Sequence, residues 1–114
     1  MKKVILGLLL FTTSFVATAD NIGLGKVAAI KEYDFNSLSA VKIYLEASAT
    51  VKNSNCQENG KTYGFITLSK HDSNTVNRMV SMATAAYFSG KKIRIFSESN
   101  TCEIDFLALQ ENEF

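Results

Sequence analysis

The sequence predicts a small, mainly β domain with a single helix, and two observations support this fold class. One stretch, residues 72–90, repeats apolar side chains at the helical spacing of three and four. Most other segments alternate apolar and polar residues, or carry the Gly, Asn, Ser and Asp typical of turns. These segments give the order β-β-β-α-β-β, with five strands and the helix between the third and the fourth.

The predicted helix has signals at both ends. Asp72 or Ser73 supplies a side-chain oxygen for the free N–H groups of the first turn. Gly90 follows the last turn, where glycine adopts the left-handed conformation without a steric cost. The apolar side chains of the helix form one stripe that we expect to pack against the sheet. This stripe comprises Val76, Met79, Val80, Ala83, Ala86 and Tyr87.

The second predicted strand, residues 40–48, has the most regular alternation. Val41 and Ile43 share one face, which we expect in the core, whereas Lys42 and Tyr44 share the solvent face. In the third strand, Gly64 indicates a bulge or a close approach of another chain segment. The polar stretch 50–61 is interpreted as a loop. The five expected strands are residues 24–33, 40–48, 62–69, 91–97 and 101–109.

The first 19 residues have the features of a secretory signal peptide. Two lysines precede an apolar run at 4–10, and the segment ends in Ala17-Thr-Ala19. The apolar run is shorter than the roughly 20 residues that span a bilayer. We therefore expect cleavage after Ala19, a periplasmic or secreted location in a bacterium, and no membrane span thereafter. Residues 20–114 are then one domain, since a chain of this length builds one core.

The charge balance argues against nucleic acid as a partner. The chain has 12 basic and 11 acidic residues. Removal of Lys2 and Lys3 with the signal leaves 12 − 2 = 10 basic residues against 11 acidic ones. A nucleic-acid-binding domain needs a basic face, which this composition does not favour.

The two cysteines, Cys56 and Cys102, predict one disulfide. An even pair in a small exported domain is most simply oxidised. The loop it closes is long, so the chain-entropy model predicts a stabilisation of about 4 kcal/mol. The alternative is a catalytic thiol that uses His71 as its base, and we do not favour it.

Few residues suggest catalysis or metal binding. His71 is the one histidine and the sequence lacks Gly-x-Ser-x-Gly, so no nucleophile has an evident base. We interpret His71 as a solvated loop residue near the helix cap. The pairs Glu32/Asp34 and Glu103/Asp105 are spaced for a shared strand face, which suits a cation or a glycosidase, but solvated strand faces also look like this. We therefore expect no catalytic residue, no metal, no cofactor and no enzymatic activity.

The element order is that of the OB-fold, a five-stranded, partly open barrel. An α+β two-layer domain with the same order is the alternative. OB barrels bind oligosaccharides or oligonucleotides on strands two and three and in adjoining loops. Sugars need an apolar ring to stack on and a few fixed polar groups. The candidate ligand-binding residues are Tyr33, Asp34, Asn36, Ser37 and Tyr44. Phe35, in the same turn, belongs either to this site or to the core.

The segment Ala85-Ala-Tyr-Phe-Ser-Gly-Lys-Lys-Ile-Arg-Ile-Phe96 joins the helix to an isoleucine-rich strand. With the signal peptide, the cysteine pair and the strand order, it resembles the B subunits of AB5 toxins. The subtilase cytotoxin and pertussis-like group is most similar, with related small uncharacterised periplasmic proteins. The resemblance covers the C-terminal half. It implies an OB-fold subunit that forms a homopentamer and binds host-cell glycans, with the exposed helix face around the centre of the ring.

We therefore expect a non-enzymatic, exported domain that recognises carbohydrate in the manner of a toxin B subunit. The alternative is a small periplasmic protein-interaction or inhibitor protein that has no glycan ligand. Co-purification of a protein partner would distinguish the second reading from the first.

Overall fold

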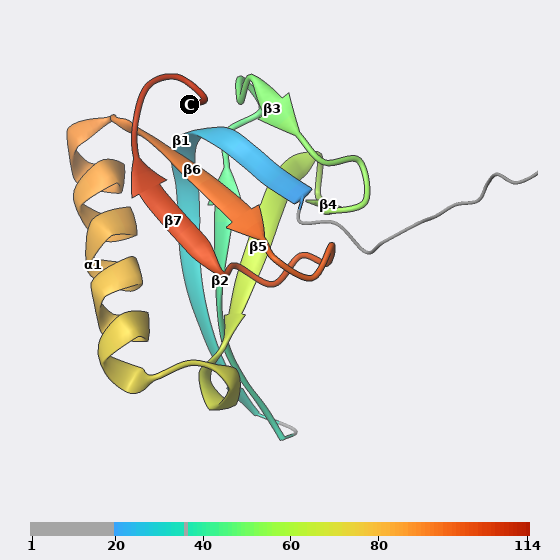
Figure 1. The fold of residues 1–114 in the computed structure, drawn as a ribbon, viewed down its shortest axis with the longest axis vertical. Helices are drawn as coiled ribbons and strands as arrows, with labels where there is room; N and C mark the ends of the chain where they lie inside the picture. The colour runs from blue at the N-terminus through green and yellow to red at the C-terminus, as the bar shows by residue number, and fades with distance from the viewer. Residues whose placement is uncertain (1–19, 36) are drawn as a thin grey trace, which may run out of the picture.

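The computed structural model of the protein describes residues 20–35 and 37–114. The expected signal peptide, residues 1–19, and the candidate ligand residue Asn36 lie outside the described residues. Within them, the chain folds into one seven-stranded sheet with a single α-helix beside it (Figure 1). None of the helices in the described ranges combines the length and the apolar character needed to cross a membrane.

Strands make up most of the ordered structure. They are β1 (Asp20–Phe35), β2 (Leu38–Leu45), β3 (Val51–Lys52), β4 (Gln57–Glu58), β5 (Lys61–Thr67), β6 (Lys92–Ser97) and β7 (Phe106–Leu109). A short 3-10 helix, η2 (Leu68–Lys70), leads into α1 (Ser73–Ser89).

The long strand β1 joins the two halves of the sheet. The spatial order is β4-β5-β2-β1-β6-β7, and β3 pairs with β1 beside this path. The first part of β1, residues 20–26, pairs with β6, and the second part of β1, residues 27–35, pairs with β2. The register shifts between Val27 and Ala29, close to the point where β1 changes partner. All these pairings are antiparallel.

The expected number of strands was wrong, because the sheet has seven and not five. The two additional strands, β3 and β4, form within the stretch 50–61 that was interpreted as a loop. Each has only two residues, so neither produces a readable alternation in the sequence. Their pairing depends on contacts with β1 and β5, which local sequence does not reveal.

The fifth expected strand is shorter than predicted, because regular pairing with β6 begins only at Phe106. The residues before it instead make one isolated parallel bridge to β5, between Glu103 and Phe65. The N–H of Phe65 donates to the carbonyl of Cys102 at 2.9 Å, and the N–H of Ile104 donates to that of Phe65 at 2.8 Å. Ile104 is fully buried at this bridge, whereas Phe106 in β7 is 42% exposed.

The ends of α1 agree with the sequence. The side chain of Asp72 accepts a hydrogen bond from the N–H of Thr75 at 3.2 Å, and Gly90 has a left-handed φ of 70°. Val76, Ala83 and Ala86 of the predicted stripe are buried, and Met79 and Val80 are half-buried. Tyr87 is exposed, contrary to the prediction. The residues of β1 beside it include Ala28 and Ala29, whose side chains are too short to cover its ring.

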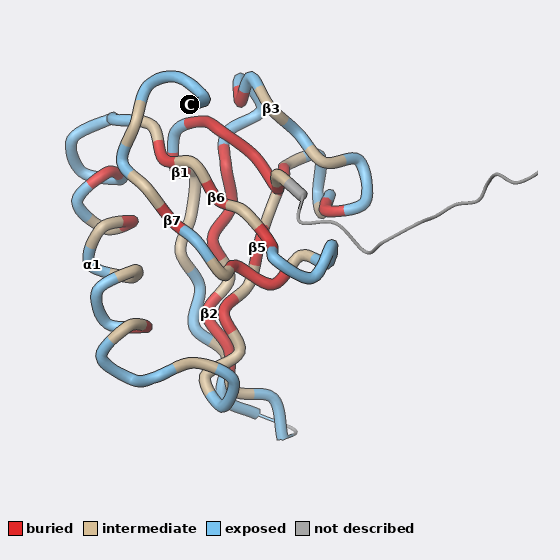
Figure 2. Tube along the Cα trace, viewed as in Figure 1, coloured by how far each residue is buried: buried red, intermediate tan, exposed pale blue. Residues whose placement is uncertain are grey.

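The buried residues lie along the centre of the sheet and on the helix face beside it (Figure 2). The core is mostly aliphatic, and its fully buried members include Ile22, Ile43, Leu45, Ile66, Ile93, Ile95 and Ile104. The close approach expected at Gly64 is confirmed, since a Cβ there would lie 2.6 Å from Cγ1 of Ile104. The Cys56–Cys102 disulfide is also confirmed, with Cα atoms 5.7 Å apart.

Candidate functional site

One face of β1, β2 and β5 carries most of the ring and lysine side chains of these strands. Successive strand residues point to opposite faces, so the pairing register decides which side chains meet. Lys42 of β2 pairs with Lys31 and Phe65, and Tyr44 pairs with Ala29 and Tyr63. We call this surface the aromatic face. Its members are Lys31, Tyr33, Phe35, Lys42, Tyr44, Tyr63 and Phe65.

Rings on the aromatic face contact one another in two groups. The ring of Tyr63 lies 5.9 Å from that of Tyr44 and 6.5 Å from that of Phe65, between centroids. Tyr33 and Phe35 form the second group, stacked at 5.9 Å. These separations are typical of favourable aromatic pairs. The rings of Tyr33, Tyr63 and Phe65 are half-buried, so part of each remains accessible to a ligand.

Lys42 connects the two groups of rings, and Lys31 contacts one of them. Nζ of Lys42 lies 5.2 Å from the ring centroid of Tyr33 and 5.1 Å from that of Tyr63. Nζ of Lys31 lies 4.9 Å from the ring of Tyr44. An ammonium at such a distance is attracted by the ring quadrupole. The aromatic face is therefore an organised set of side chains.

Glu58 of β4 completes the network from the edge of the sheet. Its carboxylate accepts hydrogen bonds from the Tyr44 hydroxyl and from Nζ of Lys42, the latter at 3.2 Å. The Tyr44 hydrogen bond, followed by that of Lys42, holds the pKa of Glu58 below its usual value. Burial, and then the bond to Glu58, raises the pKa of Tyr44 far above its usual value. Tyr44 therefore stays a neutral donor to an ionised carboxylate.

The structure separates the candidate ligand residues into three locations. Tyr33 and Tyr44 share the aromatic face, but Tyr44 is only 3% exposed, and its ring packs against that of Tyr63. Asp34 is exposed and points to the opposite face of β1. Ser37 lies in the β1–β2 turn with a positive φ of 64°. The neighbouring Phe35 is 58% exposed, which excludes the alternative that it folds into the core.

Sequence reasoning missed Lys31, Tyr63, Phe65 and Glu58 as members of this site. The alternation within residues 61–67 places Tyr63 and Phe65 on one face. Only the register of β5 against β2 shows that this is the face of Tyr44. Nothing in the sequence near Glu58 indicates that its side chain reaches Lys42, because that contact depends on a two-residue strand.

His71 belongs to a second polar cluster, which adjoins the aromatic face where Glu103 pairs with Phe65. Its Nε2 lies 2.7 Å from Oε2 of Glu103 and 3.8 Å from Oδ1 of Asp105. Glu103 also accepts from the N–H of Thr67 at 2.8 Å and from its hydroxyl at 2.7 Å. The interpretation of His71 as a solvated loop residue was wrong, since its side chain is only 14% exposed. Turn η2 brings it back over the segment that leads into β7.

The His71 cluster offers little room for chemistry. Both oxygens of Glu103 are occupied by protein donors, and its side chain is 6% exposed. Within residues 20–35 and 37–114, no three His, Cys, Asp or Glu side chains are grouped so that they could hold a metal ion. The cluster therefore connects chain segments, whereas the aromatic face is the better candidate for ligand binding.

Comparison of the chain with protein-family models, curated proteins and solved structures finds no match. The resemblance to the B subunits of AB5 toxins stays a prediction.

Proposed function

We propose that the protein is an exported, non-enzymatic OB-like domain that binds carbohydrate on its aromatic face. The observation that carries this proposal is the row of accessible rings of Tyr33, Tyr63 and Phe65 beside Lys42. The C–H faces of a sugar stack on such rings, and its hydroxyls need a few polar groups in fixed positions.

The sheet topology supports the OB-like barrel in this proposal. β5 lies near one end of the sheet and β7 at the other, yet the Phe65–Glu103 bridge brings the chain before β7 alongside β5. In a two-layer α+β domain with a flat sheet, the two ends of the sheet would stay apart. The strand β1 pairs with β6 along its first part and with β2 along its second part, which also supports a sheet that curves toward a barrel. The helix between β5 and β6 has the place that it has in OB-folds. The short strands β3 and β4 are additions to the five-stranded plan.

The polar groups of the aromatic face suit the orientation of a sugar. Glu58 holds Nζ of Lys42 in place, so this ammonium loses little further freedom when a ligand binds. Lys31 lies on the neighbouring strand and offers a second ammonium. Rings with pre-ordered donors on a rigid sheet are the combination that carbohydrate recognition needs.

The disulfide supports export, because such bonds persist in oxidising compartments such as the periplasm or the cell exterior. A homopentamer of the toxin B-subunit kind belongs to the same proposal. A glycan array probed with the mature chain, together with sedimentation, tests both parts. A chain that binds no glycan would contradict the carbohydrate proposal, and a monomer would contradict the pentamer.

A second candidate function is the binding of a protein partner. Phe35 and Leu38 pair across the end of the β1–β2 hairpin and are 58% and 43% exposed. This hairpin projects beyond the rest of the molecule (Figure 1). Exposed apolar side chains at a projecting tip are typical of protein contacts. Co-purification with the double variant Phe35→Ser/Leu38→Ser as control tests it. A partner captured by wild type and lost from the variant would favour this function.

A further inference from the structure

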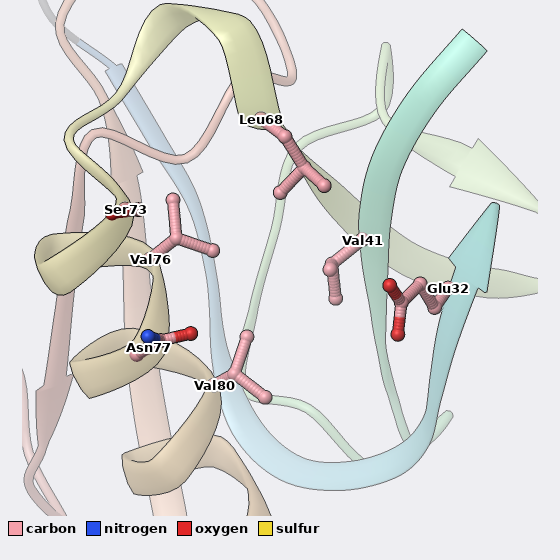
Figure 3. A pocket seen from close by; sticks show the side chains of 7 residues that line it. All are labelled: Glu32, Val41, Leu68, Ser73, Val76, Asn77 and Val80. Carbon is pink, nitrogen blue, oxygen red and sulfur yellow. The ribbon is translucent and has the colours of Figure 1, made fainter. Parts of the chain in front are cut away.

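A pocket lies on the opposite face of the β1–β2 hairpin from the aromatic face, between that hairpin and α1 (Figure 3). Its volume is about 230 Å³. Four aliphatic side chains surround it, Val41, Leu68, Val76 and Val80. Such a lining favours an aliphatic group of the ligand, because burial removes apolar surface from water.

Three polar side chains complete the lining: Glu32, Ser73 and Asn77. Figure 3 shows the carboxylate of Glu32 and the amide of Asn77 on opposite sides of the space, with the valines between them. Within the described part of the chain, no hydrogen bond or ion pair engages any of these three side chains. They therefore have unused capacity for a ligand.

The charge of the pocket selects the ligand class. Glu32 is the one charged side chain in the described lining, and it is an acid. A protonated amine complements it, whereas a carboxylate or phosphate would be repelled. The amide of Asn77 and the hydroxyl of Ser73 both donate and accept hydrogen bonds, so either complements a carbonyl next to that amine.

We propose that this pocket binds a primary ammonium group attached to a branched aliphatic side chain, as at an amino-acid amide or at the N-terminus of a peptide. The ammonium pairs with Glu32 and the aliphatic group lies among Val41, Val76 and Val80. A neighbouring carbonyl of the ligand accepts from Asn77. This site is independent of the carbohydrate proposal, because alternate residues of β1 and β2 point to the two faces.

L-leucinamide is a small probe with all three features. Titration into the ¹⁵N-labelled mature chain at pH 6, where its amine is protonated, is expected to move the amide signals of Val76, Asn77 and Val80. The expected dissociation constant is about millimolar, as a ligand of this size allows. N-acetyl-leucinamide lacks the charge and glycinamide lacks the aliphatic group. Each is expected to bind at least about tenfold more weakly, the equivalent of one lost ionic or apolar contact.

The tripeptide Leu-Gly-Gly distinguishes a peptide N-terminus from a small amine as the ligand of the pocket. Tighter binding than leucinamide assigns the pocket to peptide N-termini. Equal or weaker binding of the tripeptide assigns it to small amines.

Two variants test the role of Glu32. Glu32→Gln keeps the size of the side chain and is expected to weaken leucinamide binding about tenfold, while N-acetyl-leucinamide binding stays unchanged. Glu46→Gln removes the same charge from an exposed position outside the pocket and is expected to change neither. Three results would each overturn the proposal. They are equal binding of leucinamide and N-acetyl-leucinamide, unchanged leucinamide binding by Glu32→Gln, and signal changes confined to residues outside the pocket. A pocket filled by a second copy of the chain would overturn it too, since leucinamide would then cause no change.

Discussion

Nε2 of His71 lies 2.7 Å from Oε2 of Glu103, across 32 positions of sequence. This contact ties the start of α1 to the segment that leads into β7. It lies beside the Phe65–Glu103 bridge, which joins the same segment to β5. Glu103 thus lies where the segment before β7 meets β5, and its side chain adds hydrogen bonds to the backbone bonds of its two neighbours.

Replacement of Glu103 by glutamine is expected to lower the free energy of unfolding by about 2 kcal/mol, since a buried acceptor is lost and donors stay unsatisfied. The amide of glutamine has one acceptor oxygen, whereas Glu103 accepts from both groups of Thr67 and contacts His71. Urea unfolding followed by circular dichroism measures the change. Glu98→Gln, at an exposed position in the preceding turn, is the matched control. Equal midpoints for the two variants would contradict this role of Glu103.

Reduction of the Cys56–Cys102 disulfide is expected to destabilise the chain. The bond spans 46 positions, so the chain-entropy model gives a loss of about 4 kcal/mol. Urea unfolding with and without a reductant measures the difference, and mass spectrometry confirms the gain of two hydrogen atoms. The double variant Cys56→Ala/Cys102→Ala should match the reduced wild type. A reduced chain as stable as the oxidised one would contradict the prediction.

Glu58 is expected to make stability depend on pH on the acid side. Its pKa in the folded chain is lowered by Tyr44 and Lys42, so the unfolded chain binds the proton more readily. The contribution is present above the usual carboxyl range and is lost as the pH falls through the folded pKa. Urea midpoints of wild type and Glu58→Gln should differ near neutral pH and converge as the pH falls from about 5 to about 3.

The size of this effect is limited, because the Glu58 side chain is 39% exposed and solvent screens its charge. Glu46→Gln, which removes a carboxylate without the Tyr44 and Lys42 partners, is the control. A gap between wild type and Glu58→Gln that stays constant over the whole pH range would show that the charge of Glu58 is not its cause.

Local signals in the sequence predicted the parts of the fold that local chemistry determines. Asp72 and Gly90 identified both ends of α1, because caps satisfy backbone groups within one turn. The alternation around Val41 placed Val41 and Ile43 correctly in the core, but Tyr44, expected on the solvent face, is only 3% exposed. The cysteine pair was predicted from its number and from the expected compartment.

Features that depend on distant partners were not predictable in this way. β1 runs on through Phe35 and changes partner near Val27, which only the positions of β2 and β6 explain. The contact between His71 and Glu103 and the reach of Glu58 to Lys42 join residues far apart in sequence. The candidate site was accordingly predicted in part. Tyr33 and Tyr44 were named, whereas Tyr63 and Phe65, whose rings continue from that of Tyr44, were not.

Carbohydrate binding on the aromatic face is tested most directly by one titration series. The best glycan from an array is titrated into wild type, Tyr63→Ala and Phe88→Ala, with the fold of each variant checked by circular dichroism. Phe88 is an exposed ring on α1, 81% accessible and outside the aromatic face. We expect Tyr63→Ala to weaken binding about tenfold, the equivalent of about 1.4 kcal/mol, and Phe88→Ala to leave it unchanged. A folded Tyr63→Ala variant that binds the glycan as tightly as wild type would contradict the account.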